Sequence, residues 1–193
     1  MKILTFDRCI GEVMKMPPSL TVIPDSALVQ GSNPMFLADF SEEWVGEAYL
    51  AFRVSRLGKG IASKFASRYY DAVTVGLRAV AVNLSNELRL SQSAMGLTGA
   101  FDNALALGSW QPIADPAGDV PPNITLSVFG TGVSAGWDSI GINEAIVNLG
   151  RFMTVKTGDV VMPCRLNVAQ PLRPNTIINA VLNGTEVLRL KIK

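Results

Sequence analysis

Apolar and polar residues alternate with a period of two over several segments of the chain, a pattern typical of half-buried β-strands. The alternation is clearest over residues 44–54. One face of that strand would carry Trp44, Ala48, Leu50, Phe52 and Val54, and the other Val45, Glu47, Tyr49, Ala51 and Arg53. Because residues two apart on a strand point the same way, Glu47, Tyr49 and Arg53 are predicted to share a polar face that lines a pocket or meets solvent.

The same reasoning predicts further strands, at 2–6, 70–84, 124–129, 160–162, 176–182 and 185–193. The last two flank Asn183-Gly184, which favours a type I′ hairpin turn. Helical spacing is found over 61–69 and again up to Gly150, which is predicted to end its helix in a left-handed conformation. A short helix is expected over 85–95, Asp138 or Ser139 is expected to cap the helix before Gly150, and 130–136 reads as a glycine-rich link. The result is a mixed α+β fold with roughly nine or ten strands and two or three short helices.

Composition adds limits on size, partners and compartment. The 193 residues, 48% hydrophobic and 17% charged, fit one domain, 1–193, with a leading strand and linker over 1–20. The low charged fraction leaves apolar surface, which favours a homo-oligomer. A net charge of +1 provides no basic patch for nucleic acid. No apolar run approaches the roughly 20 residues needed to span a bilayer, so no membrane partner is expected.

The chain contains no histidine. This excludes Ser-His-Asp and Cys-His catalysis, His-ligated zinc and every histidine general base. The two cysteines, Cys9 and Cys164, have no metal-type spacing and are predicted to be free thiols in a reducing compartment. The first residues alternate like a strand and do not resemble a signal peptide, so a cytoplasmic protein is expected.

One charged residue stands out within a predicted strand. Arg78 lies in the middle of the apolar segment 70–84. Since an unpaired buried charge is costly, Arg78 needs a partner: either a structural ion pair or an anionic ligand. Arg53 and Arg165 are candidates to add to such an anion pocket, with surface solvation as the alternative.

Two segments carry a resemblance to a known family. They are Phe101-Asp102 with Leu107-Gly108, and Leu149-Gly-Arg-Phe-Met-Thr-Val-Lys-Thr-Gly-Asp-Val-Val161. In order and spacing they resemble the fumarylacetoacetate hydrolase family, over about residues 21–193. The resemblance implies a β-roll-like catalytic domain fold, usually a homodimer. It also implies a magnesium or calcium ion, held by Glu-x-Glu on one strand and an aspartate on a later strand, that polarises an oxo acid for cleavage, hydration, decarboxylation or tautomerisation.

The positions that this resemblance assigns to the metal differ from the family pattern. Glu-x-Glu falls on Glu47-Ala48-Tyr49, so one carboxylate is kept and the other is replaced by a phenol, and the aspartate falls on or near Arg78. One carboxylate and one phenol make a poor magnesium or calcium site. We therefore expect no cofactor, with a bound divalent ion disfavoured, and we expect Arg78 to replace the cation and to pair with Glu47.

Three hypotheses follow from the sequence. In the first, the chain is a degenerate family member that binds a small carboxylate at Arg78 or acts as a structural homodimer. In the second, it is an active enzyme on an acylpyruvate-like oxo acid, with Glu47, Tyr49 and Arg78 as catalytic residues and with no metal or a weakly held one. In the third, it pairs with an intact relative of the same family.

Overall fold

The structure, a computed structural model, describes residues 1–31, 33–114 and 120–193. Over these residues it consists mainly of strands with short helices, so the predicted mixed fold is confirmed. The strands are β1 (Lys2–Phe6), β2 (Leu20–Pro24), β3 (Trp44–Val54), β4 (Tyr70–Ala81), β5 (Leu105–Leu107), β6 (Gln111–Pro112), β7 (Asn123–Val128), β8 (Thr131–Gly136), β9 (Val160–Met162), β10 (Arg165–Pro171), β11 (Ile177–Leu182) and β12 (Thr185–Lys191). The helices are α1 (Val82–Leu90), α2 (Trp137–Ile140) and α3 (Ile142–Phe152), with 3-10 segments η1 (Asp25–Ala27), η2 (Ser63–Tyr69) and η3 (Met95–Gly99).

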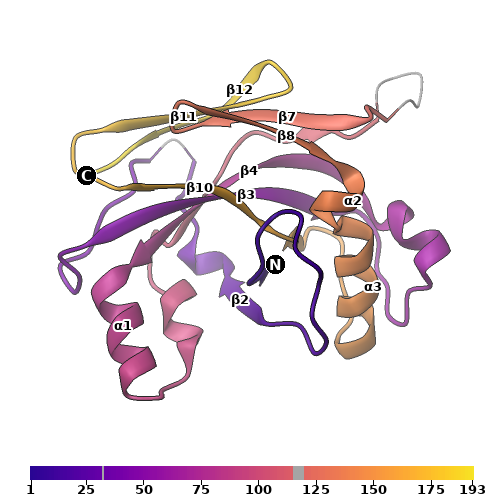
Figure 1. Cartoon of the computed structure of the whole chain (residues 1–193), viewed down its shortest axis with the longest axis horizontal. Coiled ribbons are helices and arrows are strands. Elements are labelled where there is room, and N and C mark those ends of the chain that lie inside the picture. The colour runs from indigo at the N-terminus through magenta and orange to yellow at the C-terminus, as the bar shows by residue number, and fades with distance from the viewer. Residues whose placement is uncertain (32, 115–119) are drawn as a thin grey trace.

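Two sheets form the body of the molecule. The larger has the order β2-β1-β9-β3-β4-β5, with β10 paired to β3 and β6 to β4. The smaller has the order β12-β11-β7-β8 and covers one face of the larger, as Figure 1 shows. β1, from the segment predicted to lead the chain, lies inside the larger sheet between β2 and β9.

The alternation of β3 divides its side chains as predicted. Leu50 and Phe52 belong to the main core, together with residues of the smaller sheet such as Leu126. Tyr49 and Ala51 point to the opposite side and join a smaller cluster with Ile3 and residues of β2 and β9. The face of β3 that does not serve the main core is therefore free to form a site.

Several local predictions are wrong. Residues 130–136 are not a link, because β8 pairs with β7 along its whole length. The strand predicted to reach residue 84 ends at Ala81, where α1 begins. Gly150 lies inside α3, where a Cβ would meet the Ile61 backbone nitrogen at 3.2 Å, so close packing rather than helix termination explains this glycine. The helix caps are Gly136 and Gly141, not Asp138 or Ser139.

The hairpin at Asn183-Gly184 is confirmed. Both residues have positive φ angles, 47° and 80°, as a type I′ turn requires. In the part of the chain that the structure describes, no helix is long and apolar enough to cross a membrane.

A buried carboxylate joins the start of the chain to the turn before β9. Asp159 accepts hydrogen bonds from the backbone nitrogen of Lys2 at 2.9 Å, from Lys2 Nζ at 2.6 Å and from the backbone nitrogen of Lys156 at 2.9 Å. Burial alone would raise the pKa of this carboxyl. The hydrogen bonds from Lys2 and Lys156 outweigh burial and hold the pKa below its usual value. Asp159 thus fixes the parallel pairing of β1 with β9.

We predict that Asp159→Ala lowers the free energy of unfolding by about 3 kcal/mol, because three hydrogen bonds worth about 1 kcal/mol each are lost. Since its pKa is lower in the folded state, the carboxylate stabilises the fold above its unfolded-state pKa, and this stabilisation is lost as pH falls through the folded-state pKa. Urea titrations between pH 7 and pH 3 measure both effects. Asp159→Asn should show a shallower loss of stability on acidification, and an unchanged acid dependence would contradict this assignment.

Candidate functional site: a guanidinium-lined cavity

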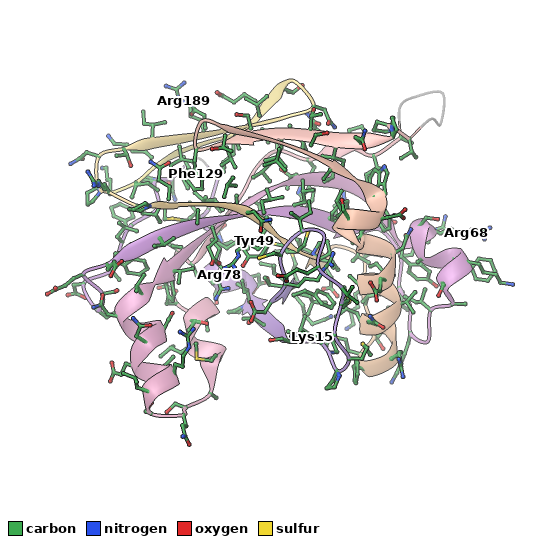
Figure 2. All side chains as sticks on the ribbon, viewed as in Figure 1. Lys15, Tyr49, Arg68, Arg78, Phe129 and Arg189 are labelled. Atoms are coloured by element: carbon green, nitrogen blue, oxygen red, sulfur yellow. The ribbon has the colours of Figure 1, made fainter. Side chains whose placement is uncertain are left out.

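The register of the larger sheet brings together residues from three strands. Glu47 and Tyr49 lie two apart on β3 and share a face. Glu47 stands directly opposite Arg78 of β4, and Tyr49 stands opposite Arg165 of β10. Figure 2 shows Tyr49 and Arg78 close together under the curled larger sheet, on the side away from the smaller sheet.

These residues line a cavity of about 240 Å³. This is below the roughly 300–1,000 Å³ of pockets for drug-sized ligands, so the cavity suits a small molecule. Its lining is rich in cations and hydroxyl groups: Arg78, Arg89 and Arg165 supply positive charge, and Thr5, Ser19, Thr21, Ser85 and Thr98 supply hydroxyls, beside Glu47 and Asp7. Such a lining is suited to a small oxyanion.

The carboxylate of Glu47 is fully engaged within the protein. Arg165 Nη1 forms an ion pair with Oε1 of Glu47, and the Tyr49 hydroxyl donates to Oε2 at 3.0 Å. The predicted pair of Glu47 with Arg78 is therefore wrong. Although Arg78 lies opposite on β4, the partner of Glu47 is Arg165 on the other neighbouring strand.

Tyr49 is held in its protonated form. Burial, and then the negative charge of Glu47, raise the pKa of Tyr49 above its usual value, and the nearby charge of Arg78 offsets only part of this rise. The phenol already donates its proton to Glu47. Tyr49 is thus a hydrogen-bond donor that orients Glu47 and is poorly suited to act as a base.

Arg78 is a partly buried charged group of the cavity that has no oppositely charged partner among the described residues. Its Nη2 donates to the carbonyl oxygen of Thr98 at 3.2 Å and to Oγ1 of Thr98 at 3.1 Å, and both acceptors are neutral. Within the described residues, no carboxylate oxygen lies within 4 Å of its guanidinium. Arg78 Nε is buried without a hydrogen-bond partner. Thr5 also lines the cavity. Among the described residues, its Oγ1 is the one other buried side-chain nitrogen or oxygen atom without a hydrogen-bond partner.

The donor set does not fit a hard divalent cation. Calcium takes six to eight oxygen ligands, and magnesium takes six, of which one or two are carboxylates and several are waters. Among the described residues, no group of three or more histidine, cysteine, aspartate or glutamate side chains is arranged to hold a metal ion. Both oxygens of Glu47 are already engaged, and two guanidinium groups, those of Arg78 and Arg165, add positive charge beside them.

The remaining candidate residues from the sequence analysis are not part of the cavity lining. Arg53 is outside the cavity lining: it forms a bidentate pair with Asp71 and lies 5.9 Å from the centre of the Trp110 ring. Cys9 accepts a hydrogen bond from Arg165 Nη2 at 3.4 Å. Cys164 is fully buried, and burial raises the pKa of its thiol to about 11, so it is an unreactive core residue. Both cysteines are free, as predicted.

The sequence did not reveal most of the cavity lining beyond Glu47, Tyr49, Arg78 and Arg165. Thr98 and Arg89 come from η3 and α1, and Thr5 comes from β1. The need of Arg78 for a partner was visible, but nothing in the local pattern identifies a threonine twenty residues later as that partner. β10, which carries Arg165 into the sheet, was also missed, because its outer residues are exposed and its pairing with β3 is irregular.

Comparisons with known proteins find similarity at the level of structure. A search against protein-family profiles and a search of curated protein sequences give no match. A protein of Yersinia pestis assigned to the fumarylacetoacetate hydrolase family superposes with a TM-score of 0.82 at 20% identity, covering 100% of this chain and 92% of that one.

Two further solved structures with a similar fold are of named enzymes. Fumarylpyruvate hydrolase from Pseudomonas aeruginosa, solved with Mn²⁺ and pyruvate, superposes with a TM-score of 0.82 at 18% identity, covering 100% of this chain and 89% of that one. The 5-carboxymethyl-2-hydroxymuconate delta-isomerase from Mycobacterium smegmatis gives 0.79 at 17% identity, covering 99% and 78%. The fold predicted from the two sequence segments is therefore confirmed: the chain has the domain fold of fumarylacetoacetate hydrolase family proteins.

Proposed function

We propose that this chain is a degenerate member of the fumarylacetoacetate hydrolase family that binds a small carboxylate through Arg78 and lacks the family's divalent metal site. The observation that carries the proposal is the state of Arg78. Its guanidinium lines the cavity, meets only neutral acceptors and retains a buried Nε without a partner. A ligand carboxylate supplies the anionic, bidentate acceptor that the guanidinium lacks.

Electrostatics support a carboxylate over a metal ion. With the ion pair between Arg165 and Glu47 internally neutral, the lining retains the positive charges of Arg78 and Arg89 against the negative charge of Asp7, a net charge of +1. Positive charge attracts an anion and repels Mg²⁺ or Ca²⁺. The pyruvate in the Pseudomonas aeruginosa structure is a small carboxylate of the size that this cavity suits.

The alternative is turnover of a small oxo acid without a metal. The hydrolase and isomerase among the structural neighbours favour this second function. The arrangement of Tyr49 and Glu47 favours binding without turnover, because the carboxylate is engaged by Arg165 and the phenol stays protonated. The homodimer and the pairing with an intact relative stay predictions from the resemblance.

We predict that isothermal titration detects binding of at least one acid among acetate, pyruvate, malonate and succinate, and no binding of the uncharged ethyl pyruvate. Arg78→Met should weaken that binding by about 10- to 100-fold, the worth of a hydrogen-bonded charge. It should lower the free energy of unfolding by about 1–2 kcal/mol, because the two hydrogen bonds from Arg78 to Thr98 are lost. Arg53→Met is the matched control. Arg53 lies on the face of β3 that carries Glu47 and Tyr49, but it is outside the cavity lining.

Binding that survives Arg78→Met, or no binding of any of the four acids, would contradict the proposal. Incubating the unmodified protein with pyruvate and oxaloacetate and following substrate loss by NMR tests the alternative. Turnover that Arg78→Met abolishes would favour the enzyme.

The loss of the metal site gives a separate prediction. Purified wild-type protein should contain no stoichiometric magnesium, calcium or manganese by elemental analysis. The double variant Tyr49→Glu with Arg78→Asp, which places three carboxylates where β3 and β4 face each other, should gain Mn²⁺ binding measurable by titration. Stoichiometric metal in the wild type would show that the donor set has been misread. If the double variant gains no binding, the position assigned to the site is wrong.

A further inference from the structure

One wall of the cavity is formed by a segment that contributes few buried residues to the molecule. The segment 82–99, which we call the arm, contains α1 and η3 and contributes Ser85, Arg89, Met95 and Thr98 to the lining. No residue of α1 is buried. Figure 1 shows α1 lying below the larger sheet, away from the core between the two sheets. The arm therefore owes little of its position to apolar burial.

The arm is attached at both ends. At its start, Asn83 Oδ1 accepts hydrogen bonds from Ser41 Oγ at 2.9 Å and from the Glu43 backbone nitrogen at 3.0 Å.

The attachment that borders the cavity is the one at its end. Thr98 is 5% exposed and Gly99 is buried. Gly99 lies so close to β2 that a Cβ there would meet Ile23 at 3.0 Å. Thr98 donates its hydroxyl proton to the Met95 carbonyl at 2.7 Å, and its carbonyl and hydroxyl oxygens accept from Arg78 Nη2. The guanidinium proposed to bind the ligand is thus also an anchor of the arm.

The geometry of arginine makes these two uses compete. Arg53 in this same chain binds a carboxylate through Nε and Nη2, at 2.9 and 3.1 Å from the two oxygens of Asp71. On Arg78 the equivalent edge is covered in this structure: Nε is buried and has no partner, and Nη2 donates to Thr98. A carboxylate that binds Arg78 as Asp71 binds Arg53 accepts from Nη2 as well as Nε, so it competes with the two Thr98 oxygens for the N–H groups of Nη2.

We infer that Thr98 is an autoinhibitory residue: it occupies the carboxylate-binding edge of Arg78, and a small carboxylate binds by displacing it and releasing the arm. The inference rests on the proposed carboxylate function of Arg78 and adds the means by which that site is regulated. A charged carboxylate outcompetes two neutral acceptors at a guanidinium, because charge-assisted hydrogen bonds are about twice as strong as neutral ones. The displacement lowers the apparent affinity of the closed form.

The test compares Thr98→Val with Thr98→Ser, titrated with pyruvate and malonate. Valine keeps the shape of the side chain but removes the hydroxyl that accepts from Arg78 and holds Met95. We expect Thr98→Val to bind the acid about fivefold more tightly, the worth of one competing neutral hydrogen bond. Thr98→Ser keeps the hydroxyl and should match the wild type. If Thr98 instead orients Arg78 for the ligand, Thr98→Val binds more weakly, and weaker or unchanged binding overturns the inference.

A second measurement follows the arm directly. In the wild type, saturating pyruvate or malonate should accelerate amide hydrogen exchange within residues 82–99, while β3 and β4 are unchanged or protected. Slower exchange in the arm on ligand addition would overturn the inference. The outcomes distinguish the carboxylate function of Arg78 from the inhibitory role of Thr98. Binding that depends on Arg78 but is not tighter in Thr98→Val contradicts only the role of Thr98. Absence of binding in both the wild type and Thr98→Val contradicts the carboxylate function itself, and this inference with it.

Discussion

The antiparallel pairing of β3 with β4 is the constraint on which the rest of this structure depends. It runs from Trp44 opposite Ala81 to Val54 opposite Tyr70, and one face of it supplies much of the main core. A shift of one residue would move Leu50 and Phe52 out of that core, so the register is held by apolar burial. The register then determines the polar face: Glu47 must lie beside Arg78, and Tyr49 two residues away must share their side. Packing of the main core thus determines where the site residues lie, although no core residue of β3 lines the cavity.

Within this geometry, the distribution of charge decides which chemistry is open. Glu47 contacts a phenol and a guanidinium, which satisfy both of its oxygens. That arrangement leaves the Glu47 carboxylate unavailable to a cation or as a proton acceptor. Arg78, on the strand opposite, is left with neutral partners. Two arginines and one glutamate leave one guanidinium without a carboxylate, and because Arg165 binds Glu47, that guanidinium is the one of Arg78.

How much of this the sequence could predict depends on the range of the interactions. The strand 44–54 and its two faces followed from local alternation, and the Asn183-Gly184 hairpin followed from backbone preferences, because both are set within a few residues. The fold followed from the order of two segments. The partner of Glu47 did not, because Arg165 arrives on a strand 118 residues away whose own pattern is irregular. β8 was missed because Gly130–Gly136 has weak strand propensity, and it becomes a strand only through pairing with β7.

The unsatisfied groups point to function more strongly than any residue type does. A buried donor without a partner costs roughly 1–3 kcal/mol, and protein interiors rarely retain one. In the described part of this chain two such atoms remain, Arg78 Nε and Thr5 Oγ1, and both belong to residues of the same cavity. If Arg78 served only the fold, an apolar side chain on this apolar strand would remove that cost. The unpartnered Nε of Arg78 is therefore the observation on which the proposed carboxylate ligand rests.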